Sequence, residues 1–229
     1  IMTKVGIYAI LRVNGTVFDD AMAQSIFKNT LLLIGLITSI YGVIGAIGAE
    51  RLRRFVGFMV LSSVGTLLIA IAMFNTQAWS AGLYYLVHST LIAAAFYLFC
   101  GWITAQRGMF KDHLKVAPKI KNEKAAALTY FLIAMMMAGL PPFSGFLGKV
   151  FILQATAETA YQGWIIAIIL IVSLLSILAL TRVGFILFWR ASPPEIDPNE
   201  AAYQTYQGLP AYAPNRNDTA IYIILAGLM

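Results

Sequence analysis

The chain has 229 residues, of which 60% are hydrophobic and 11% are charged, and its mean hydropathy is +0.78. A soluble domain carries about 25% charged residues, so this composition excludes that class and predicts a polytopic membrane protein. The net charge of +6 comes from short basic segments between apolar runs, which indicates membrane orientation rather than nucleic-acid binding. The single cysteine, Cys100, excludes an internal disulfide and a multi-cysteine metal site.

The chain begins and ends in apolar runs that are too short to cross a membrane alone. Residues 1–13 contain Lys4, Tyr8 and Arg12, whose spacing of four places them on one helical face. Lys4 would lie deep in a span whose beginning is missing, or else flank the membrane, whereas Arg12 can reach the interface. Residues 219–229 are also apolar, but a span needs about 20 residues. We therefore expect an internal piece of a longer protein.

Further apolar runs predict membrane spans at residues 30–49, 55–74, 81–103, 125–156 and 163–189. The polar or basic segments between the spans are predicted to be loops, at residues 14–29, 50–54, 75–80, 104–124, 157–162 and 190–218. The fold expected is all-α. Residues 1–229 would form a single transmembrane domain with about six full or near-full helices and a truncated last one.

Polar groups lie at the centres of two of these spans. The span 55–74 carries Ser62, Ser63 and Thr66, which would either support close helix packing or form the wall of a hydrated path. The span 81–103 contains His88, and Tyr84 lies one turn before it on the same face. Histidine can carry a proton near neutral pH, although a buried neutral histidine with one hydrogen bond is the alternative.

The run 125–156 is predicted to be a broken helix. As one straight helix it would measure about 46 Å, whereas the hydrocarbon core of a membrane is about 30 Å thick. Adjacent prolines remove backbone donors and clash with the preceding turn, and glycines add backbone freedom. The residues expected to break the helix are Gly139, Pro141, Pro142 and Gly145.

The break would place Lys149 at membrane depth. Irregular backbone at that depth must be buried in protein or line a wet cavity, and broken helices with a buried charge are typical of ion transporters. The alternative is a proline kink followed by a lysine that reaches the membrane surface.

Lys4, His88 and Lys149 are therefore the candidate proton-relay residues. A charge at the bilayer centre costs about 2.5–3.5 kcal/mol, and desolvation favours neutral lysine, so a buried lysine can both accept and release a proton. No metal cluster, nucleophile–base pair or phosphate loop accompanies them, so we expect a transporter subunit without a cofactor rather than an enzyme. The residues predicted to line the path are Tyr8, Ser62, Ser63, Thr66, Tyr84 and Ser144.

The basic segments predict the orientation of the chain in the membrane. Segments 50–54 and 104–124 are two spans apart, so they must lie on the same side, and basic loops face the cytoplasm. Segment 190–218 is then also a cytoplasmic loop. The tryptophans at 79, 102, 164 and 189 fall at span edges, as an aromatic belt requires.

Three segments in this order resemble the antiporter-type membrane subunits shared by respiratory complex I and the Mrp (also Pha or Mnh) multisubunit cation/proton antiporters. They are Lys-Val-Gly-Ile-Tyr-Ala-Ile-Leu-Arg at 4–12, Leu-Tyr-Tyr-Leu-Val-His-Ser-Thr at 83–90, and Ala-Gly-Leu-Pro-Pro-Phe-Ser-Gly-Phe-Leu-Gly-Lys at 138–149. The second and third segments are most similar to the D subunits of the Mrp type.

This resemblance implies a fold of fourteen helices in two inverted repeats, of which the chain would supply the C-terminal part with the second half-channel. Lys4 would match the family's central lysine, His88 its relay histidine and Lys149 the terminal lysine of a broken twelfth helix. Some complex I relatives carry glutamate at that last position, so Lys149 argues against them. The family's glutamate–lysine pair of the first half-channel would lie upstream.

Three functions remain open on the sequence. The resemblance favours a proton-translocating subunit of a Na⁺(K⁺)/H⁺ antiporter in the bacterial inner membrane. Its partners would be other subunits, H⁺, Na⁺ or K⁺, and lipid, with no nucleic acid. The alternative is a proton-pumping membrane subunit of NADH-quinone oxidoreductase, and the third is a scaffold subunit without transport.

Overall fold

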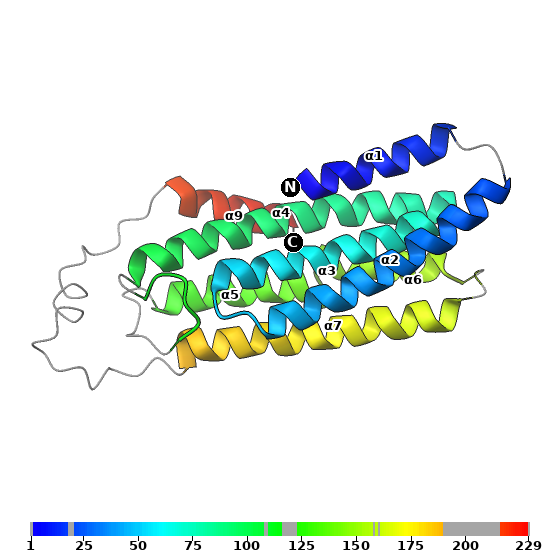
Figure 1. The fold of residues 1–229 in the computed structure, drawn as a ribbon. Helices are drawn as coiled ribbons and strands as arrows, with labels where there is room; N and C mark the ends of the chain where they lie inside the picture. The colour runs from blue at the N-terminus through cyan, green and yellow to red at the C-terminus, as the bar shows by residue number, and fades with distance from the viewer. Residues whose placement is uncertain are drawn as a thin grey trace, which may run out of the picture.

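The computed structural model describes residues 2–17, 21–107, 110–115, 123–157, 159, 161–189 and 216–228. Figure 1 shows the long helices running side by side along one axis. Within the described residues the backbone is helical, apart from turns and one isolated bridge between Arg51 and His113. The elements are α1 (Met2–Val17), α2 (Ala21–Ile47), α3 (Leu52–Ala72), α4 (Thr76–Gln106), α5 (Glu123–Ala138), α6 (Ser144–Ala155), α7 (Gln162–Gly184), the π-helical η2 (Phe185–Trp189) and α9 (Arg216–Leu228).

Four helices are long and apolar enough to cross a membrane, namely Ile26–Ile47, Leu52–Ala72, Thr76–Gln106 and Gln162–Trp189. They confirm the spans predicted at 30–49, 55–74, 81–103 and 163–189, although the first two helices end at Ile47 and Ala72, two residues earlier than predicted. The predicted broken span is also present, as α5 followed by α6. The described part of the chain is thus all-helical, and the chain is a multi-pass membrane protein.

The loops predicted at 14–29, 75–80 and 104–124 are shorter in the structure than predicted. Helix α1 continues to Val17 and α2 begins at Ala21, so most of 14–29 is helical. Helix α4 begins at Thr76, because the Asn75 side chain accepts a hydrogen bond from the Ala78 N–H at 2.6 Å and caps the helix. At its other end α4 reaches Gln106. Hydropathy marks only the part of a helix that lies in lipid, so polar turns beyond it were assigned to loops.

Helices α2 and α3 pack backbone against backbone. A Cβ added at Gly42 would lie 2.7 Å from Ser62 Cα, and one added at Gly65 would lie 2.7 Å from Ser39 Cα. Real Cβ atoms do not approach so closely, so both positions need glycine. Small residues allow this approach in membranes, where apolar side chains gain little by leaving lipid.

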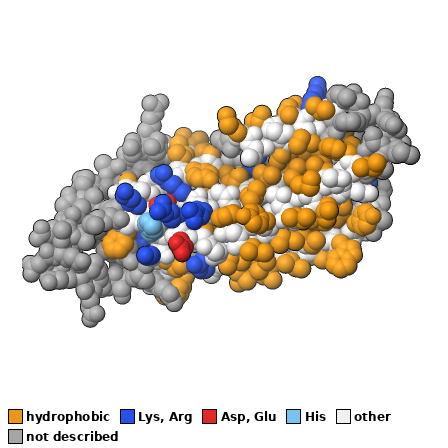
Figure 2. Space-filling view, in the orientation of Figure 1, with side chains coloured by type: hydrophobic (Ala, Val, Ile, Leu, Met, Phe, Trp, Pro, Cys, Tyr) orange, Lys and Arg blue, Asp and Glu red, His pale blue; other side chains and the backbone are white. Residues whose placement is uncertain are grey.

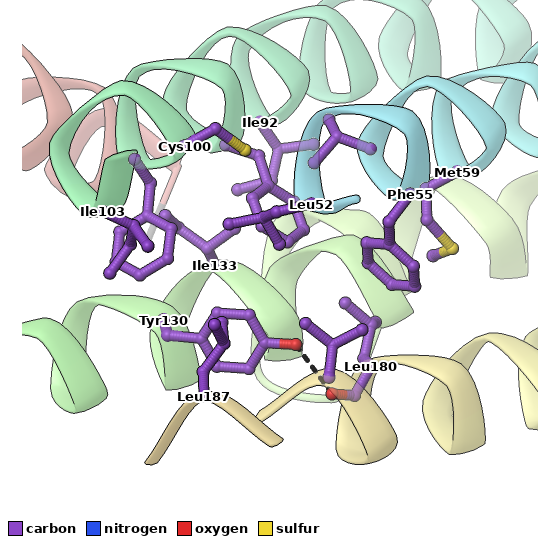
Figure 3. Packing of buried hydrophobic residues seen from close by; sticks show 14 of the residues in the cluster. Leu52, Phe55, Met59, Ile92, Cys100, Ile103, Tyr130, Ile133, Leu180 and Leu187 are labelled. Carbon is purple, nitrogen blue, oxygen red and sulfur yellow. Dashed lines mark hydrogen bonds between the residues drawn. The ribbon is translucent and has the colours of Figure 1, made fainter. Parts of the chain in front are cut away.

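A cluster of large side chains holds α3, α4, α5 and α7 together toward one end of the bundle (Figure 3). Within it the buried Tyr130 hydroxyl of α5 donates a hydrogen bond to the Leu180 carbonyl of α7 at 2.7 Å. Cys100 is fully buried in the same cluster. Other members are Leu52, Phe55, Ile92, Ile103, Ile133 and Leu187.

The two basic segments meet at that end of the bundle, as predicted. The Leu52 N–H donates to the Asp112 carbonyl at 2.7 Å, and the Leu114 N–H donates to the Glu50 carbonyl at 2.8 Å. Buried Arg107 donates to the carbonyls of His113 and Lys115, each at 2.7 Å, and burial lowers the pKa of its guanidinium. Figure 2 shows lysine and arginine side chains gathered there. The predicted cytoplasmic loop 190–218 lies largely outside the described residues.

We expect the Gly42→Ala variant to be destabilised by about 1–3 kcal/mol, the usual cost of overpacking, because the new methyl group would meet the α3 backbone. Gly101→Ala in α4 is the matched control, since no atom lies within 4 Å of its added Cβ and alanine favours a helix by about 1 kcal/mol over glycine. Thermal unfolding of the detergent-solubilised protein measures both. Equal stability of the two variants would contradict the close α2–α3 contact.

Candidate functional site

The candidate site is built around the break between α5 and α6. Gly139 has a φ of +74°, its N–H donates to the Met136 carbonyl at 3.2 Å, and the Leu140 N–H donates to the Met135 carbonyl at 3.1 Å. These two bonds close the end of α5 as a glycine-based helix C-cap. The chain then turns through Pro141 and Pro142. The predicted break is confirmed but shorter, because α6 already begins at Ser144 and includes Gly145.

His88 of α4 contacts both halves of the broken helix. Its Nδ1 lies 2.9 Å from the Ser144 Oγ, and its Nε2 lies 3.2 Å from the Met136 carbonyl oxygen. The carbonyl can only accept, so Nε2 carries a proton, and in the neutral ring Nδ1 accepts from the Ser144 hydroxyl. When the ring gains a second proton, Nδ1 donates to Ser144 instead, and the hydroxyl can donate to the Leu228 carbonyl, 2.7 Å away. The ring therefore has hydrogen-bond partners in both protonation states.

Two glycines of α6 allow this contact with α4. A Cβ at Gly145 would lie 2.6 Å from His88 Nε2 and 2.6 Å from the Met136 carbonyl oxygen, so any side chain there would displace the ring. A Cβ at Gly148 would lie 3.0 Å from the Tyr85 ring. The spacing of three residues places both glycines on the face of α6 that lies against α4.

Lys149 of α6 reaches back across the break. Its ammonium donates to the Ala138 carbonyl at 2.7 Å and to the Ser173 Oγ of α7 at 3.0 Å. Ala138 is the last residue of α5, where unpaired carbonyls give a helix its negative end. The lysine thus binds a carbonyl that the break leaves without a helical partner.

A small cavity of about 20 Å³ lies between His88 and Lys149, which is room for about one water molecule. Its walls are rich in hydroxyl groups. Several of them donate to carbonyls of their own helix: Ser63 to Val60, Ser89 to Leu86 and Ser176 to Val172. Their oxygen lone pairs remain as acceptors for a water or an ammonium group. The hydroxyl groups around the cavity are those of Ser62, Ser63, Thr66, Tyr85, Ser89, Ser173 and Ser176.

Lys4 lies on the buried face of α1, beside Ile7. Helix α1 packs on α3 and on α4, the helix that carries His88. Its Nζ is buried and has no hydrogen-bond partner among the described residues. An unpaired ammonium group in such a place is costly, so this position calls for a neutral lysine, a water or a partner group.

Sequence reasoning named several of the cavity residues but not all of them. Tyr8 and Tyr84 lie outside the cavity wall and are 47% and 39% exposed. Tyr85 lines the cavity instead and is buried. Residues three and four positions before His88 are both its helical neighbours, so spacing alone could not choose between the tyrosines.

Ser173 and Ser176 of α7 were missed. Their signal was present, because two hydroxyl residues three positions apart interrupt a strongly apolar run. In contrast, Ser62, Ser63, Thr66, His88 and Lys149 were named from the sequence and border one cavity.

Comparison with known proteins identifies a family for residues 1–177, which match the model of the NADH:quinone oxidoreductase/Mrp antiporter transmembrane family. The D subunit of the Na(+)/H(+) antiporter of Bacillus subtilis is 31% identical over 211 residues, which cover 91% of this chain and 41% of that protein. The D subunit of a probable K(+)/H(+) antiporter of Rhizobium meliloti is 31% identical over 219 residues. The match covers 82% of this chain and 41% of that protein. The chain thus spans less than half the length of these relatives.

Two solved structures share the fold. The Mrp complex from Dietzia sp. contains a chain of 31% identity with a TM-score of 0.73, over 81% of this chain and 34% of that one. Respiratory complex I from Thermus thermophilus contains a chain that is 17% identical, with a TM-score of 0.77. The match covers 98% of this chain and 44% of that one. From the match over residues 1–177 and from these relatives, the chain belongs to the NADH:quinone oxidoreductase/Mrp antiporter transmembrane family.

Proposed function

We propose that this chain forms the second half-channel of a proton-translocating subunit in a multisubunit Na⁺(K⁺)/H⁺ antiporter. The observation that carries the proposal is the hydroxyl-lined cavity at the break, which His88 and Lys149 border together. The printed names of the Bacillus and Rhizobium relatives support antiport of sodium or potassium against protons. The family's fourteen-helix inverted repeat would supply the first half-channel from the rest of the protein.

The proton would pass along Lys4, His88 and Lys149. Lys4 is the group that most needs to release its proton, because its Nζ lacks a partner among the described residues. His88 can bind a proton while keeping Ser144 and Met136 as partners. One water in the cavity would connect the ring to Lys149, whose protonated form is held by Ala138 and Ser173.

The chain would act within a hetero-oligomeric complex of the bacterial inner membrane. The end of the bundle that carries the basic residues would face the cytoplasm, since positive charge is retained on that side. Fold similarity to a complex I chain keeps a proton-pumping subunit of NADH-quinone oxidoreductase as the second candidate. A scaffold role would require the buried cations to be structural ion pairs, but neither Lys4 nor Lys149 has a carboxylate partner among the described residues.

Replacing Lys149 by methionine should lower proton transport by about a hundredfold, at the low end of what a positioned proton-transfer group contributes. Methionine is unbranched and only one atom shorter than lysine, so it keeps most of the side-chain volume but removes the titrating group. Lys28→Met, in α2 away from the cavity, is the matched control. Transport by the full-length subunit in its complex is measured in everted vesicles, normalised to the amount assembled. Normal transport in Lys149→Met would exclude the lysine from the path.

Replacing Ser173 by alanine removes one of the two acceptors that hold the Lys149 ammonium. Hydrogen bonds to charged groups are worth about 1.5–3 kcal/mol, so we expect roughly tenfold slower transport at pH 7. Ser173→Thr keeps a hydroxyl and should retain most activity. Ser80→Ala, which removes an exposed hydroxyl bonded only to its own helix, serves as the control. If Ser173→Ala and Ser80→Ala behave alike in the vesicle assay, Ser173 does not hold the relay lysine.

Deletion of the gene in its host distinguishes the two transport functions. The antiporter function predicts growth sensitivity to sodium at alkaline pH. It also predicts that everted vesicles lose the dissipation of a proton gradient on addition of Na⁺ or K⁺. Loss of NADH-driven proton pumping with cation-dependent dissipation intact would overturn the antiporter proposal in favour of the complex I function.

A further inference from the structure

A second cavity lies on the outer face of the bundle, between α5 and the α7–η2 segment. Its volume is about 710 Å³, within the range of about 300–1,000 Å³ for ligand pockets. It extends along α5 from Ala127 to Ala138 and reaches Leu140 in the helix break. Apart from Tyr130, whose hydroxyl is bonded to Leu180, and Thr181, whose hydroxyl is bonded to its own helix, the lining side chains are apolar. We call this cavity the α5–α7 groove.

The shape of the groove suits a thin flexible chain better than another helix. Small residues line its less exposed part, namely Ala127, Ala134 and Gly184. Large side chains stand along its edges, such as Phe131, which is 59% exposed, and Phe185. Membrane helices approach each other over small residues, as α2 and α3 do. The bulky edges keep a helix about 10 Å wide away from the small residues between them.

A basic residue, Lys124, stands in the first turn of α5, three residues before Ala127, the first residue of α5 that lines the groove. Lys124 precedes Leu128 by four residues and Phe131 by seven, so all three lie on the same face of α5. Lys124 is exposed and lies at the N-terminal end of α5. Trp189, 82% exposed, closes η2 at the same mouth of the groove, a place that tryptophan favours at the membrane surface. Arg182 of α7 does not contribute, since its guanidinium donates to the Ile47 carbonyl.

We propose that the α5–α7 groove binds one acyl chain of an anionic phospholipid and that Lys124 binds the lipid's phosphate. The apolar lining accepts the chain, and the lysine at the mouth lies at the level of the headgroups. A basic group beside a cleft between membrane helices is the arrangement that recognises anionic headgroups. This site is separate from the cavity at His88 and Lys149, so its test does not depend on the transport proposal.

The test measures lipid that stays with the full-length subunit in its complex. The complex is stripped of lipid, exposed to vesicles of phosphatidylglycerol or of phosphatidylcholine, and examined by native mass spectrometry. Unaltered protein should retain one more phospholipid than the Ala134→Trp variant, whose indole would fill the groove. Lys124→Gln should still bind lipid but should lose about fivefold of its preference for phosphatidylglycerol, the effect of one lysine near an anionic surface.

Two matched controls separate the groove from general lipid contact. Ala125→Trp adds the same indole to α5 outside the groove lining, and Arg54→Gln removes a charge at the same end of the bundle, on α3. Both should bind lipid like the unaltered protein. Equal retention by the Ala134→Trp and Ala125→Trp variants would overturn the proposal. A photo-crosslinking residue at Phe131 gives the second readout: a lipid adduct supports the site, and an adduct to a protein segment refutes it.

Discussion

The hydrogen bond from the Lys149 ammonium to the Ala138 carbonyl is the contact on which the rest of the site depends. A broken helix exposes carbonyls, and in a bilayer each unsatisfied backbone group costs several kcal/mol. The glycine cap occupies the carbonyls of Met135 and Met136, and the lysine occupies that of Ala138. The break and the charge therefore stabilise each other: the break supplies the acceptor that makes a cation tolerable at this depth, and the cation pairs a carbonyl that the break leaves free.

The small polar cavity lies between helices that pack unusually closely. The glycines of α6 let this helix pack closely against α4, so that His88 reaches the Met136 carbonyl. The glycines of α2 and α3 let those two helices approach each other in the same way. Hydroxyl groups around the cavity satisfy their own protons within their helices, for example Ser176 with Val172. These hydroxyl groups can therefore be buried at a small cost in free energy while their lone pairs remain available as acceptors. This combination allows an apolar helix bundle to contain a cavity for one water molecule.

Helix α5 separates two different environments. Its Met136 carbonyl contacts His88, and Met137 borders the small polar cavity. Its opposite side, with Leu128 and Phe131, faces the α5–α7 groove. The last residue, Ala138, takes part in both, since its carbonyl binds Lys149 and the residue lines the groove. A molecule seated in the groove would thus contact the same helix end that binds Lys149.

The sequence by itself determined the membrane class, the spans, the helix break and the identity of the ionisable groups. Hydropathy, prolines and isolated charges determine the structure of their own segment, so their effects can be predicted without knowing which helices are neighbours. The three-dimensional arrangement alone decided that Tyr85 rather than Tyr84 lines the cavity, that α7 contributes Ser173, and that Gly145 makes room for His88. Those facts depend on how far each helix is rotated about its axis and which helix it meets. The rotation of each helix is set by side-chain packing between segments such as α4 and α6, which lie far apart in the chain. A sequence pattern within one helix does not identify the helix that packs against it.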